Sequence, residues 1–124
     1  MKRTLSALLA LVMLFTLAAC GKKAEKLSDP VSFTVIVTDL EGNETTFEYT
    51  SNAASVGEAL VAEGLVVGHE ASYGLYIDAV NGIAANWDKD QTYWAFYINA
   101  EYAQAGVDST PIVDGETYML KVES

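Results

Sequence analysis

The chain offers few side chains that could carry out catalysis. It contains one histidine, His69, and one cysteine, Cys20. Nucleophilic catalysis needs a hydroxyl or thiol beside a base that a third group orients, and a zinc site needs three or four ligands. His69 lies between Gly68 and Glu70, a segment we expect to be a solvent-exposed loop before a strand. The sequence therefore predicts neither catalytic residues nor a metal site, and we expect that the protein is not an enzyme.

Carboxylates are abundant enough to raise glycoside hydrolysis as an alternative. An acid and a base on either side of a sugar bond would suffice for that reaction. Asp88, Asp90 and Glu101 are the nearest candidates for such a pair. Acidic loops are common in proteins, however, and no cleft follows from the sequence, so this alternative ranks low.

Calcium binding is a further alternative, because oxygen-bearing side chains alternate in residues 39–43 and again in residues 88–90. A complete calcium loop also needs a central glycine and a closing glutamate. Counted from Asp39, these positions hold Glu44 and Thr50. A hairpin turn therefore explains residues 39–43 better than a calcium loop.

The single cysteine closes a segment typical of bacterial lipoprotein signals. Basic residues 2 and 3 precede the uncharged apolar residues 5–17, and Ala18-Ala19-Cys20 follow. The apolar stretch is shorter than the ~20 residues that span a bilayer. We therefore expect residues 1–19 to be a cleaved signal peptide and Cys20 to carry the lipid that anchors an extracytoplasmic protein to the bacterial cell membrane. An ordinary secretory signal or a retained anchoring helix is the alternative.

The charge balance argues against nucleic acid as a partner. The chain has 17 acidic and 7 basic residues, for a formal net charge of −10. Beyond residue 30 the only basic residues are Lys89 and Lys121. Such a domain is repelled by phosphate backbones. Residues 20–30 hold most of the remaining lysines, and we expect them to form a flexible tether, either near anionic lipid or as a solvated spacer.

The aromatic residues are the remaining candidates for a binding surface. In residues 93–99, alternation assigns one set of side chains to the core: Trp94, Phe96 and Ile98. It leaves the other set on the opposite face: Tyr93, Tyr97 and Asn99. Trp87 lies in a polar loop. An exposed surface of this kind suits a flat, amide-rimmed or sugar ligand, or a protein partner, and sheet packing without a ligand is the alternative.

These side chains must be positioned by a small set of elements. Residues 31–38 and 45–50 alternate as strands around a turn, and Ser55 with Glu58 has the spacing of a capping box that starts a helix over residues 56–63. Further strands are predicted over these ranges: 73–80, from 83 after Asn81-Gly82, 93–99 and 116–122. The order predicts an α+β domain over residues 31–124, with a mostly antiparallel sheet, one short helix and a β-grasp-like topology.

Several blocks also occur in an order that resembles one known family. They are residues 33–37, 55–60, 77–83, 93–99 and 106–115. The Val-Asn-Gly and Tyr-Trp-x-x-Tyr-x-Asn blocks are similar to those of the transcobalamin-like C-terminal domain family, in a bacterial lipoprotein member. The resemblance implies a β-grasp-like domain of the soluble ligand-binding group, whose animal relatives form the smaller cobalamin-contacting domain of cobalamin carriers. Ala100 departs from the family, which often has glycine there.

The resemblance implies a non-enzymatic, surface-anchored ligand-binding lipoprotein. Its implied ligand is a cobalamin-like or other amphipathic small molecule, and a corrinoid would be a ligand rather than a resident cofactor. The residues expected near it are Trp87, Tyr97, Asn99 and Tyr102. A surface protein or transporter could act as a partner. The alternative function is an accessory or adhesion domain that docks another cell-surface protein.

Overall fold

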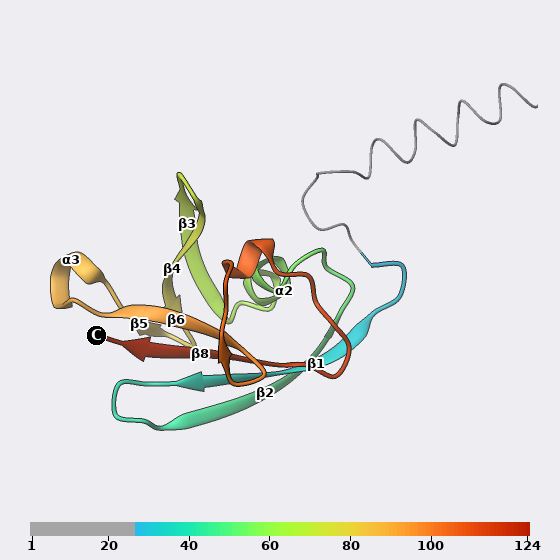
Figure 1. Cartoon of the computed structure of the whole chain (residues 1–124), viewed down its shortest axis with the longest axis horizontal. Coiled ribbons are helices and arrows are strands. Elements are labelled where there is room, and N and C mark those ends of the chain that lie inside the picture. Colours follow the sequence, from blue (N-terminus) through green and yellow to red (C-terminus); the bar gives the residue numbers. More distant parts are fainter. Residues whose placement is uncertain (1–26) are drawn as a thin grey trace, which may run out of the picture.

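The computed structural model describes residues 27–124, and Figure 1 draws the preceding residues as a thin grey trace. The predicted signal peptide (residues 1–19), the lipid anchor Cys20 and most of the predicted tether lie outside the described residues. Within residues 27–124, no helix is both long enough and apolar enough to cross a membrane.

The main sheet has five strands in the order β2-β1-β8-β6-β7. Their bounds are Val31–Thr38 for β1, Glu44–Ser51 for β2, Tyr93–Ile98 for β6, Glu101–Tyr102 for β7 and Thr117–Glu123 for β8. All neighbours pair antiparallel except β1 and β8, which are parallel. The predicted α+β class with a mostly antiparallel sheet is confirmed.

A second, three-stranded sheet joins β3 (Val66–Ala71), β4 (Gly74–Val80) and β5 (Ile83–Ala84). The β3–β4 hairpin rises away from the main sheet (Figure 1). The expected loop around His69 is wrong, because His69 lies in β3 opposite Tyr76. A bulge between Val67 and Gly68 breaks the register, so the two-residue alternation that would have indicated a strand is lost.

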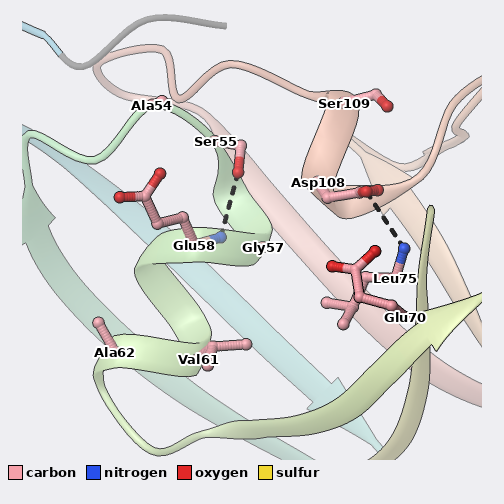
Figure 2. Close-up of a pocket in the computed structure, with 10 residues that line it drawn as sticks. All are labelled: Ala54, Ser55, Gly57, Glu58, Val61, Ala62, Glu70, Leu75, Asp108 and Ser109. Atoms are coloured by element: carbon pink, nitrogen blue, oxygen red, sulfur yellow. Dashed lines mark hydrogen bonds between the residues drawn. The ribbon is translucent and has the colours of Figure 1, made fainter. Parts of the chain in front are cut away.

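Helix α2 (Val56–Ala62) covers one face of the main sheet and begins as predicted. The Ser55 hydroxyl accepts a hydrogen bond from the Glu58 backbone N–H at 3.1 Å, which satisfies an otherwise free helix amide. The helix ends before Gly64, which has a φ of +78°. In a full capping box the Glu58 side chain would also accept from the Ser55 backbone N–H. This part of the prediction was wrong, because the Glu58 carboxylate turns away from Ser55 (Figure 2).

Two short helical turns add to the single helix that the sequence predicts. One is α3 (Trp87–Asp90), in which the Asn86 side chain accepts from the Lys89 N–H. The other is the 3-10 turn η1 (Val107–Ser109), which packs against α2. Both are too short to show helical periodicity, and Trp87 therefore begins a helical turn and not a loop.

The core lies between α2 and the main sheet, and Tyr118 is at its centre. Its ring is fully buried and contacts Phe33 and Phe96 at centroid distances of 5.8 and 6.0 Å. The Tyr118 hydroxyl accepts from the Val113 N–H at 3.0 Å and donates to the Pro111 carbonyl at 3.4 Å. The buried cluster runs from Phe33 to Val122. Residues 27–124 thus contain a closed core and can be studied as an independent domain.

Candidate functional site

The face of the main sheet opposite α2 carries a row of large side chains. The strand register places Ile36 beside Met119, Met119 beside Tyr97, and Tyr97 beside Tyr102. Ile36, Met119 and Tyr97 alternate with core residues, and Tyr102 shares the face of its partner Tyr97, so all four point away from α2. We call Tyr93, Tyr97, Tyr102 and Met119 the tyrosine face.

Glu123 joins the tyrosines of this face. The Tyr97 hydroxyl donates to one Glu123 carboxylate oxygen, and the Tyr93 hydroxyl donates to the other at 3.5 Å. The hydrogen bond to Glu123 raises the pKa of Tyr97 to about 12. Burial, followed by the Glu123 charge, also raises the pKa of Tyr93. Both phenols therefore stay protonated at neutral pH and present uncharged rings.

Two further aromatic contacts extend the tyrosine face. Tyr97 and Tyr102 meet edge to face, with ring centroids 5.5 Å apart and an interplanar angle of 80°. Trp87 of α3 meets Tyr93 in a similar arrangement, at 6.2 Å and 65°. Trp87 and Tyr102 are 51% and 57% exposed, so both ends of the row are available to a ligand.

Asn99 lies at the turn between β6 and β7. Its Oδ1 accepts from the Thr117 N–H at 3.0 Å, and its own N–H donates to the Thr117 carbonyl at 2.7 Å. The side chain thus holds the turn against β8. A hollow of about 570 Å³ lies at this turn, lined by residues that include Asn99, Tyr102 and Gln104. Asn99 and Tyr102 therefore line one hollow, Tyr97 contacts Tyr102, and Trp87 contacts Tyr93 at the other end of the tyrosine face.

The carboxylates considered for calcium have other partners. Asp39 accepts from the Asn43 and Glu41 N–H groups at 2.8 and 3.0 Å, and the bond from Asn43 lowers the pKa of Asp39. Asp90 accepts from the Thr92 hydroxyl and from the Asn86 and Thr92 N–H groups. Asp39 closes the β1–β2 turn, as the hairpin interpretation predicts, and Asp90 closes α3.

His69 is paired with a carboxylate on the neighbouring strand. Its Nδ1 lies 2.7 Å from Asp78 Oδ2 on the adjacent strand β4, and both side chains are well exposed. Within residues 27–124, no three His, Cys, Asp or Glu side chains are placed to share a metal ion.

Sequence reasoning missed a larger cavity. It measures about 660 Å³ and lies between α2, η1 and the β3–β4 hairpin (Figure 2). We call it the α2–η1 cavity. Glu58 and Val61 line it from α2, Glu70 and Leu75 from the hairpin, and Asp108 from η1. The sequence did not predict β3 or η1, which form two of the three walls. Gly57 and Gly74 permit the close packing at Asp108, but a glycine in the sequence does not by itself indicate a cavity.

The sequence profile of one family, described as a domain of unknown function (DUF4430), matches residues 45–124. The chain belongs to the DUF4430 family. Among curated proteins, none matches this DUF4430 chain.

Two solved structures resemble this DUF4430 chain. A "putative metal binding protein" from Ruminococcus gnavus is 32% identical, with a TM-score of 0.72, and the match covers 76% of this chain and 97% of that one. Haptocorrin in complex with Cbi is 22% identical, with a TM-score of 0.63 over 79% of this chain. The match spans 26% of the haptocorrin chain, about a quarter of its length. The predicted transcobalamin-like fold is confirmed, and this second likeness concerns the fold alone.

Proposed function

We propose that this DUF4430 protein is a non-enzymatic binding protein that holds a flat, amphipathic small molecule on its tyrosine face, with a corrinoid as the leading ligand. The observation that carries the proposal is the Tyr97–Tyr102 pair, whose exposed Tyr102 also lines the hollow at the β6–β7 turn. Trp87, Tyr97, Asn99 and Tyr102 are the residues that form the site. Cys20, carrying lipid, anchors the protein outside the bacterial cell membrane, with the residues before it removed as a signal peptide.

The chemistry of the tyrosine face suits such a ligand. Aromatic rings in edge-to-face or offset contact add about 0.5–1.5 kcal/mol per pair beyond the burial of apolar area. The protonated phenols of Tyr93 and Tyr97 place no charge against an apolar ring. The Asn99 amide and the backbone of its turn supply polar groups at the rim. The haptocorrin structure contains Cbi, and the R. gnavus protein is described as a "putative metal binding protein", so both similar structures are consistent with a binding role.

The test is calorimetric titration of residues 27–124 with cobalamin and with cobinamide. Wild-type domain should bind one of them with a Kd tighter than about 10 µM, or roughly −7 kcal/mol. The combined variant Trp87→Ala, Tyr97→Ala, Tyr102→Ala should bind at least about tenfold more weakly, because its ring contacts are gone. Tyr73→Ala is the matched control, since Tyr73 is 73% exposed but lies at the tip of the β3–β4 hairpin.

Absence of saturable heat with both corrinoids would refute the corrinoid assignment. Equal affinities of the wild type and the triple variant would show that the ligand binds elsewhere on the domain. The first result would remove the corrinoid as ligand, and the second would remove the assigned role of the tyrosine face.

A second function is favoured by the edge of the main sheet. Strand β2 is one of the two edge strands, and its outer hydrogen-bonding edge pairs with no other strand among residues 27–124. An extended segment of a surface protein or a transporter subunit could add to such an edge. Cross-linking on intact cells distinguishes the two functions, because an accessory domain should give a reproducible protein adduct and a small-molecule carrier should not.

A further inference from the structure

We infer that the α2–η1 cavity is a second binding site, distinct from the tyrosine face, and that it takes a small amphipathic organic cation, an ammonium group on an apolar body. The inference does not depend on the proposed function. It rests on the shape, lining and charge of the cavity.

The cavity has the size and floor of a small-molecule site. Its volume of about 660 Å³ lies within the ~300–1,000 Å³ usual for such sites. Val61 and Ala62 of α2 and Leu75 of β4 give it an apolar surface (Figure 2). Val61 is 47% exposed and lines the cavity, so an apolar ligand bound there would cover its side chain.

The rim of the cavity is acidic on the side of η1 and the β3–β4 hairpin. Figure 2 shows the Glu70 and Asp108 carboxylates there, while the carboxylate of Glu58, which also lines the cavity, points away from them. The lining contains no lysine, arginine or histidine. An anionic ligand would therefore be repelled, whereas an ammonium group could donate charge-assisted hydrogen bonds to these oxygens. The apolar floor and the acidic rim together fit an amphipathic cation.

An organic cation fits better than a metal ion. The carboxylates come from three separate elements. Within residues 27–124, no group of three His, Cys, Asp or Glu side chains lies close enough to share a metal ion. Asp108 Oδ2 already accepts from the Leu75 N–H at 3.1 Å. A metal would also gain nothing from the apolar floor, whereas the body of an alkylammonium ion would be buried on it.

The walls of the cavity are fixed by close packing around Asp108. A Cβ at Gly57 would lie 3.0 Å from the Asp108 amide nitrogen, and one at Gly74 would lie 2.7 Å from Asp108 Oδ2. These two glycines let α2 and the β3–β4 hairpin approach η1 closely. The site is therefore largely formed before a ligand arrives, which lowers the ordering cost of binding.

The test is titration of residues 27–124 with n-hexylammonium, 1-hexanol and hexanoate, followed by NMR chemical shifts. These probes share one apolar chain and differ in the charge of the head group. Hexylammonium should shift α2 and η1 amides saturably, hexanol should bind more weakly, and hexanoate should not bind. Glu70→Gln should weaken hexylammonium binding about threefold, while Glu44→Gln on the distant strand β2 should leave it unchanged.

A cavity-filling variant keeps the test independent of the carboxylates. Ala62 is exposed at the end of α2, so Ala62→Phe should retain the thermal transition of the domain and abolish hexylammonium shifts. Equal binding of the three probes, or an unaltered hexylammonium affinity in both Glu70→Gln and Ala62→Phe, would overturn the inference. The triple aromatic variant should still bind hexylammonium, so failure of the corrinoid test and failure of this one are distinguishable.

Discussion

At the scale of single residues, Glu123 keeps protons on two tyrosines of the tyrosine face. It accepts from the hydroxyls of both Tyr93 and Tyr97. Deprotonation of either phenol would remove a donor and place a second negative charge beside the carboxylate. The folded protein therefore holds the Tyr97 proton more tightly than the unfolded chain does.

The stability of the domain should consequently depend on Tyr97 at high pH. The folded-state pKa of Tyr97 is about 12, above the ordinary value of 10.0. A raised pKa contributes stability that is present below pH 10 and is lost as the pH rises from 10 to 12. Urea unfolding of the wild type and Tyr97→Phe should therefore show a stability difference that changes across this window. Tyr73→Phe, far from Glu123, should show a constant difference from the wild type, and a constant difference for Tyr97→Phe would contradict the assignment.

At the scale of one element, the backbone of the β6–β7 turn is strained. Asn99 and Ala100 have φ values of 48° and 72°, so two consecutive residues without glycine's freedom occupy the left-handed region. Asparagine tolerates this conformation, and here its side chain also bonds to Thr117. Alanine has no such compensation, because its Cβ crowds the following carbonyl.

Ala100→Gly should therefore stabilise the domain by about 0.5–1 kcal/mol, even though glycine increases the entropy of the unfolded chain. Thermal and urea unfolding measure the change. Ala105→Gly is the matched control, since Ala105 is also exposed but lacks a positive φ, and it should lower the stability. A loss of stability in Ala100→Gly similar to that in Ala105→Gly would show that the turn is unstrained.

At the scale of the whole molecule, the first and last strands of the domain, β1 and β8, pair in the middle of the main sheet. Strand β8 lies between β1, with which it pairs in parallel, and β6, with which it pairs antiparallel. Leu120 of β8 is fully buried and is paired with Val37 on one side and Phe96 on the other. The domain therefore cannot complete its core until the last strand is in place.

Leu120→Ala should lower the free energy of unfolding by about 2–5 kcal/mol, because it leaves a cavity where β1, β6 and β8 meet. Urea denaturation with an unchanged m-value would measure this loss. Lys121→Ala, one residue further on the exposed face, should change stability by less than about 0.5 kcal/mol. Similar losses in both variants would mean that β8 is not the centre of the core.

Much of the architecture follows from local patterns. Strong alternation predicted β1, β6 and β8 to within a residue or two, and the Ser55 cap predicted the start of α2. The division of β6 into a core side with Trp94 and an outer side with Tyr97 also followed from the period of two. The β3 segment failed because a bulge interrupts that period, and α3 and η1 failed because one turn is too short to carry a helical period.

The sequence by itself determined which side chains face the core, where the main strands and α2 begin, and that the four predicted site residues lie in one stretch of the chain. Tertiary structure alone decided that Glu123 links Tyr93 to Tyr97. The pairing of β8 with β6 brings Glu123 to Tyr97, which is 26 residues away in the sequence. It also decided that Glu58, Glu70 and Asp108 surround one cavity. Local patterns report the environment of each residue along its own element, whereas a site built from several elements depends on long-range packing that no local period encodes.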